Sequence, residues 1–304
     1  MMRSVKYILL TGLIAYVCGA FATDSALERQ WSDALEKTAT DGEVIWLDIQ
    51  GGKFLTLYRE DKTGNPQGAA IILHSLGAHP DWPDVISPLR KALPNYGWAT
   101  LALQMPVMPL TEPLQSHVAL FDEAPARIKA AVSYLQGNGI NNIVLIGHGL
   151  GAAMGVVFIA ANEDSGIKAF VGISMVDYKD VDPRMDSPAS LEKIKLPVLD
   201  IFGGRDLDNV RLTAAARTDA ARKAGIAITR KQELTPFKQS AIAQSALSKK
   251  SGFIAYRQFE IPGADHSFSG FEDILNKRII GWLKQYAAGT TLAKPAQQAK
   301  DKNE

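Results

Sequence analysis

The sequence is short of cysteine and carries no large excess of charge of either sign. Cys18 is the one cysteine among 304 residues, and 33 Lys and Arg residues stand against 32 Asp and Glu residues. A single thiol excludes a disulfide framework and a cysteine-ligated metal. The near balance of charge gives no reason to expect binding to nucleic acid. What remains is an ordinary composition, 46% hydrophobic and 21% charged, which can bury the core of an α/β domain.

The N-terminal residues are typical of an export signal. A short basic stretch up to Lys6 precedes the apolar residues Tyr7 to Phe21, and Ala20-Phe21-Ala22 offers the small residues at which a signal peptidase cleaves. We therefore expect residues 1–22 to be a signal peptide and the mature protein, beginning near Thr23, to be periplasmic or secreted. The alternative is an uncleaved membrane anchor, although the apolar run is shorter than the roughly 20 residues that span a bilayer. Contact with a membrane is expected only in that case.

The hydrophobic pattern after the leader predicts one α/β domain over residues 23–287. An amphipathic helix over Ser25–Thr38 is followed by two strands, Val44–Ile49 and Phe54–Tyr58, which Gly51-Gly52 would join as an antiparallel hairpin. From Gly68 onward, buried strands alternate with helices, which predicts a mostly parallel, doubly wound sheet. The expected strands are Ala69–Leu73, Trp98–Leu103, Ile143–Ile146, Phe170–Ser174, Val198–Phe202 and Tyr256–Ile261. The expected helices are Asp84–Leu93, Pro125–Gly137, Gly151–Asn162, Asn209–Ala224 and Phe271–Tyr286.

Two segments depart from this alternation. Residues 226–252 are longer than a helix-to-strand connection requires, so we expect a surface insertion, with an extra helix over Phe237–Leu247. The insertion either borders the functional site or only decorates the surface. Residues 288–304 have too little apolar content to pack and are expected to form a disordered tail.

The chain is organised around the sequence Gly147-His148-Gly149-Leu150-Gly151, which joins the strand from Ile143 to the following helix. A strand, a sharp turn and a helix make up a nucleophile elbow, whose pattern is G-x-S-x-G. Here the pattern is complete except at its centre, where Gly149 replaces the serine. Glycine offers no atom that can attack a carbonyl group.

Other residues stand where the partners of such an elbow belong. Asp206 follows a buried strand in Phe202-Gly-Gly-Arg-Asp206, and His266 follows the last strand in Gly263-Ala-Asp-His266. The sequence His74-Ser75-Leu76-Gly77 follows the strand Ala69–Leu73. The order elbow, acid, histidine resembles that of the α/β-hydrolase superfamily. In that superfamily the loop in the position of His74-Ser75-Leu76-Gly77 contributes to the oxyanion hole.

A closer resemblance rests on short motifs. Trp46-Leu47, Leu57-Tyr58-Arg59, His79-Pro80-Asp81-Trp82, Gly97-Trp98-Ala99-Thr100-Leu101 and Gly263-Ala264-Asp265-His266 are similar to those of an uncharacterised bacterial family of exported hydrolase-fold proteins. This resemblance implies a fold and an export route, and it assigns no activity.

Two functions follow as hypotheses. The first is a non-catalytic protein that binds a small molecule or an envelope partner through the former active-site cleft. The second is a carboxylic-ester-type hydrolase that uses Asp206 and His266 with Ser75 as a relocated nucleophile, or with an activated water. In the second, the N–H groups of Leu76 and Leu150 are the candidate oxyanion donors.

Each candidate residue also has a structural interpretation. The Ser75 hydroxyl would bond to its own loop, and Asp206 and His266 would be a leftover pair joining two loops. His148 is expected to point away from the pocket and to pack. His74 and His79 lack a third ligand at a recognisable spacing, so we expect neither a metal nor a cofactor.

Overall fold

The structure is a computed structural model that describes residues 23–225, 227–228 and 255–288. The expected signal peptide, the surface insertion apart from residues 227 and 228, and the expected tail from residue 289 lie outside the described residues. Within them, none of the helices is long and apolar enough to cross a membrane.

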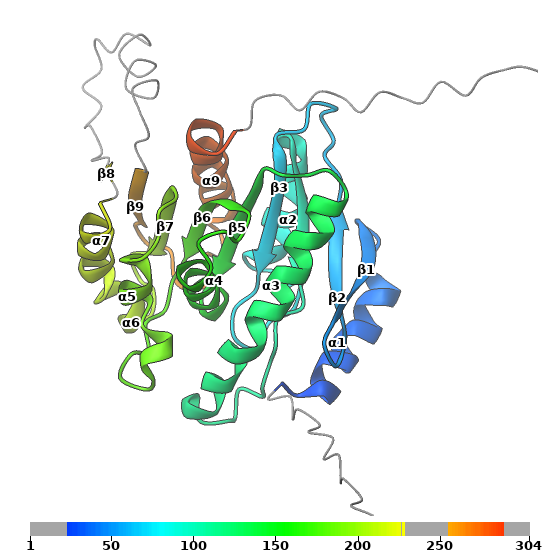
Figure 1. The fold of residues 1–304 in the computed structure, drawn as a ribbon, viewed down its shortest axis with the longest axis horizontal. Helices are drawn as coiled ribbons and strands as arrows, with labels where there is room; N and C mark the ends of the chain where they lie inside the picture. The colour runs from blue at the N-terminus through cyan, green and yellow to red at the C-terminus, as the bar shows by residue number, and fades with distance from the viewer. Residues whose placement is uncertain (1–22, 226, 229–254, 289–304) are drawn as a thin grey trace, which may run out of the picture.

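The described strands form one nine-stranded sheet in the order β1-β2-β4-β3-β5-β6-β7-β9-β8 (Figure 1). The pairs β1/β2 and β2/β4 are antiparallel and all other neighbours are parallel, which confirms the predicted hairpin and the mostly parallel sheet. The strand bounds are β1 Glu43–Ile49, β2 Gly52–Arg59, β3 Gly68–Leu73, β4 Trp98–Leu103, β5 Ile143–His148, β6 Ile167–Ile173, β7 Val198–Gly203, β8 Ala227–Ile228 and β9 Ala255–Ile261.

Helices cover both faces of the sheet, as the alternating pattern predicted. In Figure 1, α3 and α4 lie in front of the sheet, and α2 and α9 lie behind it. The α-helices are α1 Ser25–Thr38, α2 Ile86–Ala92, α3 Leu120–Gly137, α4 Leu150–Ala161, α5 Ser187–Leu191, α6 Asp208–Arg211, α7 Ala214–Lys223 and α9 Glu272–Tyr286. Short 3-10 helices span η1 Leu93–Tyr96, η2 Leu114–Ala119 and η3 Pro183–Met185.

The core is divided between the two faces because successive strand residues point in opposite directions. In β5, Leu145 belongs to the cluster packed under α3, α4, α5 and α7, whereas Val144 and Ile146 belong to the cluster under α2 and α9. Complete burial of such a side chain contributes about 1.5–3 kcal/mol. The central strands are therefore fixed from both sides, and the loops at their carboxyl ends are held close together.

The predicted start of one helix at Pro125 is wrong. Helix α3 begins at Leu120, directly after η2, and Pro125 lies inside it. Proline cannot donate a backbone hydrogen bond, which favoured placing it in the first turn. Leu120 and Phe121 are buried, and this burial favours the additional turn over the one lost bond.

The single helix predicted over Asn209–Ala224 is divided into α6 and α7. Arg217 is fully buried and forms an ion pair with Asp200, and its Nη1 donates to the carbonyl oxygen of Val210 at 2.9 Å and to Thr213 Oγ1 at 2.8 Å. Arg217 thus contacts the end of α6 from α7, and the chain turns at Leu212 and Thr213 between these two helices. The hairpin turn also differs by one residue, because Ile49 pairs with Gly52 and leaves Gln50 and Gly51 in the turn.

Candidate active site

A single residue separates the central strand from the central helix. Strand β5 ends at His148, α4 begins at Leu150, and Gly149 between them has φ 54° and ψ −118°. Its N–H donates to the carbonyl oxygen of Ile173 at 2.9 Å, which ties the turn to β6. Non-glycine residues rarely adopt a positive φ outside strained functional turns. Residue 149 is therefore at the elbow, where the sequence placed it.

The other two elbow glycines are required by close packing. A Cβ atom on Gly147 would lie 2.5 Å from Ala152 Cα, and one on Gly151 would lie 2.3 Å from the carbonyl oxygen of His74. Helix α4 thus approaches both its own strand and the exit of β3 more closely than a side chain allows. The loop that carries Ser75 is consequently packed directly against the elbow.

Ser75 fills the space that a side chain at the elbow would occupy. A Cβ atom on Gly149 would lie 2.1 Å from Ser75 Oγ, 2.9 Å from Ser75 Cβ and 3.1 Å from His266 Nε2. Ser75 Oγ and His266 Nε2 thus both lie within 3.1 Å of the position that this Cβ atom would take. Among the residues that the structure describes, Ser75 Oγ makes no hydrogen bond, neither to its own loop nor to His266.

Asp206 holds the other side of the His266 ring. Its Oδ1 accepts from His266 Nδ1 at 2.8 Å. The carboxylate is fully buried, and the imidazole is 27% exposed. Because an ionised carboxylate only accepts, Nδ1 carries a proton, and Nε2 lies on the elbow side of the ring, 3.1 Å from the position of a Cβ atom on Gly149. The structure thus brings all three predicted residues together.

The carboxylate of Asp206 is kept ionised by its neighbours. Burial acts to raise its pKa, but hydrogen bonds from His266, from the Ser174 hydroxyl and from the Gly203 N–H outweigh burial, so the pKa of Asp206 lies below its usual value. The N–H of Leu207 donates to Oδ1 at 2.8 Å as well. This set of donors also fixes the orientation of the carboxylate.

Ser174 was not singled out from the sequence. It follows β6, has φ 48°, is fully buried and donates its hydroxyl to Asp206 Oδ2. The only signal was position, since a serine at the end of a strand neighbouring the acid strand lies at the same sheet edge as the acid. Hydrophobic patterning assigned it to the strand and gave it no role.

His148 is buried and packs, as the sequence predicted, but the residue against which it packs is His266. Its ring lies against that of His266, with centroids 4.8 Å apart, and its Nε2 is 2.9 Å from the carbonyl oxygen of His266. Burial lowers the pKa of His148 to about 3, so the ring is neutral and Nε2 donates to the carbonyl. A neutral imidazole there supports the His266 loop, because it packs on the ring without adding a second charge.

His74 orients Ser75 in a similar way. Its Nε2 accepts from the Met105 N–H at 2.9 Å, so the proton lies on Nδ1, which donates to the carbonyl oxygen of Ser75 at 2.9 Å. Burial lowers the pKa of His74 to about 3. Both ring nitrogens are used by backbone groups, and neither presents a free lone pair to a metal.

A small cavity lies beside Ser75, between its loop, the segment Met105–Val107 and the first turn of α4. It has room for about one water-sized group. Leu76 and Leu150 line it, and within the described residues their N–H groups have no acceptor. The first amides of a helix have no partner inside the helix, which leaves the Leu150 N–H available to an oxygen placed here.

Comparisons with known proteins agree with this architecture. Residues 21–126 and 112–254 match the model of a family described as a protein of unknown function (DUF3530). No curated protein matches the sequence.

Among solved structures, the chain is similar to Est1E from Butyrivibrio proteoclasticus, with TM-score 0.54, 17% identity and coverage of 80% of this chain and 98% of that one. The esterase Pf2001 of Pyrococcus furiosus gives a TM-score of 0.58 at 14% identity, covering 84% and 94%. The dienelactone hydrolase of Anabaena variabilis gives 0.56 at 16% identity, covering 81% and 97%. At these identities the likeness concerns the fold, and it confirms the resemblance to α/β hydrolases. The family match covers most of the chain, so the protein belongs to the DUF3530 family and has an α/β-hydrolase fold.

Proposed function

We propose that the protein is a serine hydrolase of carboxylic-ester-type substrates, with Ser75 as its nucleophile, His266 as general base and Asp206 as the group that orients the base. One observation carries the proposal: Ser75 Oγ lies 2.1 Å and His266 Nε2 lies 3.1 Å from the position that a Cβ atom on Gly149 would take, so the serine hydroxyl occupies the volume of an elbow side chain. The nucleophile has moved from one loop to its neighbour while its chemical surroundings have stayed in place.

The reaction follows from the positions of the three side chains. Ser75 Oγ attacks the ester carbonyl carbon and gives its proton to His266 Nε2, which returns that proton to the departing alkoxide. An acyl group is left on Ser75. Water then attacks this acyl-enzyme with the same histidine as base, and the acid product leaves. Asp206 holds the Nδ1 proton and stabilises the charge that His266 gains in each step.

The oxyanion donors are the same whether the nucleophile lies on the elbow or on the Ser75 loop. In the usual arrangement the donors are the N–H of the residue after the elbow serine and an N–H of the neighbouring loop. With the serine at position 75, the residue after the nucleophile is Leu76, and the neighbouring loop supplies the Leu150 N–H. The same two amides therefore serve either arrangement, and the small cavity between them suits a single oxygen.

The sequence favoured a non-catalytic binding protein, because Gly149 removes the expected nucleophile. The position of Ser75 reverses that preference. Structural neighbours described as esterases support an ester as the substrate class. The leader-like residues 1–22 support a periplasmic or secreted location.

A fluorophosphonate probe tests the proposal on the exported protein. We expect covalent labelling of one serine, identified as Ser75 by peptide mass spectrometry, together with hydrolysis of a short-chain p-nitrophenyl ester. The Ser75→Ala variant should lose labelling, and kcat should fall by on the order of 10⁴ to 10⁶. Ser267→Ala, adjacent to His266 but bonded to Asp265, is the matched control and should keep both. Absence of labelling, or labelling that survives in Ser75→Ala, would overturn the proposal.

A further inference from the structure

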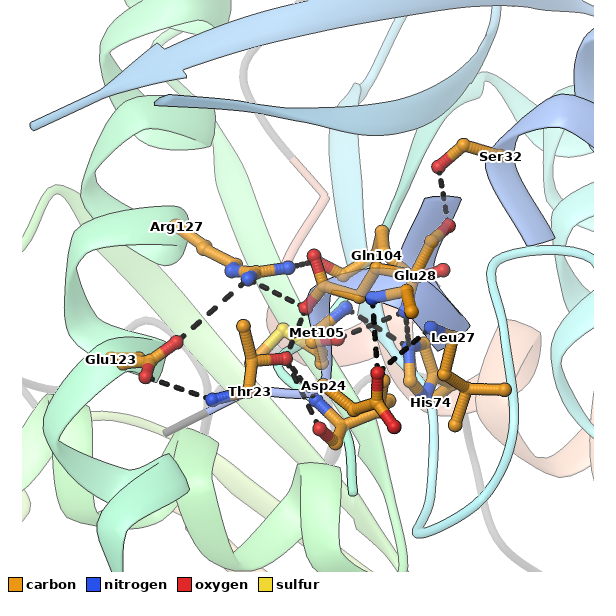
Figure 2. A network of polar contacts seen from close by, with 12 residues as sticks. Thr23, Asp24, Leu27, Glu28, Ser32, His74, Gln104, Met105, Glu123 and Arg127 are labelled. Atoms are coloured by element: carbon orange, nitrogen blue, oxygen red, sulfur yellow. Dashed lines mark hydrogen bonds and ion pairs between the residues drawn. The ribbon is translucent and has the colours of Figure 1, made fainter. Parts of the chain in front are cut away.

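The buried arginine side chains of this fold are each paired with a carboxylate. Arg127 Nη2 lies 2.7 Å from Glu28 Oε1 (Figure 2). Arg90 and Arg217 each have an aspartate oxygen at 2.7 Å, and none of the three arginine side chains is more than 3% exposed. Burial of a positive charge is costly unless an anion balances it. Arginines that come together without a carboxylate are therefore an exception that needs an explanation.

Two arginines at the last long strand, β9, have no such partner. The guanidinium carbons of Arg257, in β9, and Arg278, in α9, lie 4.8 Å and 5.1 Å from the centre of the Phe259 ring. Within residues 23–225, 227–228 and 255–288, neither arginine forms an ion pair with a carboxylate. The Nε atom of Arg257 is buried and has no acceptor among these residues. Two positive charges thus share one aromatic ring, with no described anion to balance them.

The backbone brings the three side chains to one face near the end of the sheet. Arg257 and Phe259 are alternate residues of β9, so their side chains point to the same side. Phe259 packs against the core cluster beneath α9, the helix that carries Arg278. Among the described strands, β9 is followed only by β8, which pairs with it at Ala255 and Tyr256. Because Arg278 is exposed and Arg257 is half-buried, a ligand in solution can reach both.

The segment that precedes β9 in the sequence does not offer the missing negative charge. Residues 229–254 contain five lysine and arginine residues and a single glutamate, Glu233. One carboxylate cannot balance these cations together with the two unpaired arginines. In the first turn of α9, Glu272 and Asp273 are acidic, but neither forms an ion pair with either arginine. The balancing anion is therefore expected in a ligand.

We propose that Arg257 and Arg278 bind the phosphate group of an anionic ligand, with both guanidinium groups held on the Phe259 ring. A phosphate monoester carries about −1.5 to −2 charges near pH 7, which matches two arginines, and its three terminal oxygens accept charge-assisted bonds from guanidinium groups. A carboxylate has one charge and balances only one arginine. Lipid headgroups and soluble phosphorylated molecules share this chemistry, and the experiment separates these two sources.

Calorimetric titration of the exported protein with inorganic phosphate, at pH 7.5 and constant ionic strength, tests this site. We expect saturable binding that is at least about tenfold tighter than that of acetate. Arg278→Gln and Arg257→Gln should each weaken it at least about tenfold, and Arg278→Lys at least about threefold, because lysine keeps the charge but lacks the planar fork. Arg222→Gln changes the net charge equally at an exposed arginine that is paired with Asp219, and it should leave the affinity unchanged.

Vesicles of phosphatidylcholine with and without phosphatidylglycerol identify the source of the phosphate. Sedimentation with vesicles that requires phosphatidylglycerol and is lost in Arg278→Gln assigns the site to a lipid headgroup, whereas binding of inorganic phosphate alone assigns it to a soluble ligand. Binding of neither probe, equal affinity for acetate and phosphate, or binding that survives in Arg278→Gln would overturn the inference. None of these measurements depends on catalysis, so their failure is distinguishable from failure of the proposed hydrolase activity.

Discussion

Two neighbouring strands leave the sheet through loops of nearly the same sequence. Strand β3 continues into His74-Ser75-Leu76-Gly77, and β5, whose last residue is His148, continues into Gly149-Leu150-Gly151. The strands pair in parallel with Leu73 opposite Gly147, so the two loops start level with each other. Each strand ends at or directly before a buried, neutral histidine. They differ in the residue that follows, which is serine in one and glycine in the other.

The difference is explained by how sharply each loop turns. After Gly149 the chain enters α4 at once, and the contacts at Gly147 and Gly151 leave no room for side chains. After Ser75 the chain runs on to α2, which begins only at Ile86, so Leu73 is tolerated where β5 requires glycine. The tight turn supports helix packing, and the wider turn leaves room for the Ser75 side chain beside the elbow. In the proposed mechanism the elbow serves helix packing, and the nucleophile lies on the neighbouring loop.

The largest expected effect comes from moving the serine back. Ser75→Gly should lower kcat by on the order of 10⁴ or more, and adding Gly149→Ser to that variant should recover at least about a hundredfold, because the hydroxyl returns to the same volume near His266. Steady-state hydrolysis of a chromogenic ester measures both steps.

Gly149→Ser alone is the control for this exchange. Its Cβ would lie 2.1 Å from Ser75 Oγ and its φ is positive, so we expect a loss of about 1–3 kcal/mol in unfolding free energy and no gain in kcat. A stable Gly149→Ser variant with increased activity would show that the two side chains do not compete for space.

Acidification should have an effect of intermediate size on stability, through His74 and His148. Burial lowers the pKa values of His74 and His148 to about 3, against about 6.5 in the unfolded chain. The unfolded state therefore binds protons first, and unfolding free energy should fall as the pH drops from 6.5 toward 3, by roughly 1 kcal/mol per pH unit for each histidine. Urea unfolding between pH 6.5 and 4 measures this slope.

If the two loops are matched, His74→Gln and His148→Gln should each make that slope shallower by a similar amount. An unchanged slope in both variants would mean that other groups cause the loss of stability in acid.

The smallest effect concerns Ser174, whose hydroxyl donates to Asp206. Ser174→Ala should raise the pKa of Asp206 and lower kcat a few-fold with little change in KM, since one hydrogen bond to a charged group is lost and the Gly203 N–H remains. Ser187→Ala removes another buried serine, bonded to the carbonyl oxygen of Val176, and should lower stability without changing kcat. An equal fall in kcat for Ser174→Ala and Ser187→Ala would show that Ser174 contributes through packing and not through its bond to Asp206.

Much of the fold was predictable from the sequence, because strands buried on both faces are nearly continuous apolar runs and the glycines mark the elbow. The errors arose where tertiary contacts outweighed local preference. Burial of Leu120 and Phe121 placed Pro125 inside a helix, and the bonds of buried Arg217 divided another. No periodicity in the sequence reports such contacts.

The candidate site was predictable in its members but not in its arrangement. Ser75, Asp206 and His266 follow β3, β7 and β9, which run parallel in one sheet, so their position at one sheet edge was expected. That Ser75 Oγ would lie in the volume above Gly149 depends on the parallel pairing of β3 with β5 and on rotamers, which only coordinates supply. The stacking of His148 on His266 was missed for the same reason.

The crowding between positions 75 and 149 has a consequence for the history of the family. The space above Gly149 accepts one hydroxyl group. A lineage in which the serine moved from position 149 to position 75 therefore passed through one of two ancestors. One had both serines and a strained turn, and the other had neither serine and no nucleophile. Relatives should therefore carry serine at one of these positions and a small residue at the other, and a change at one should accompany a change at its neighbour.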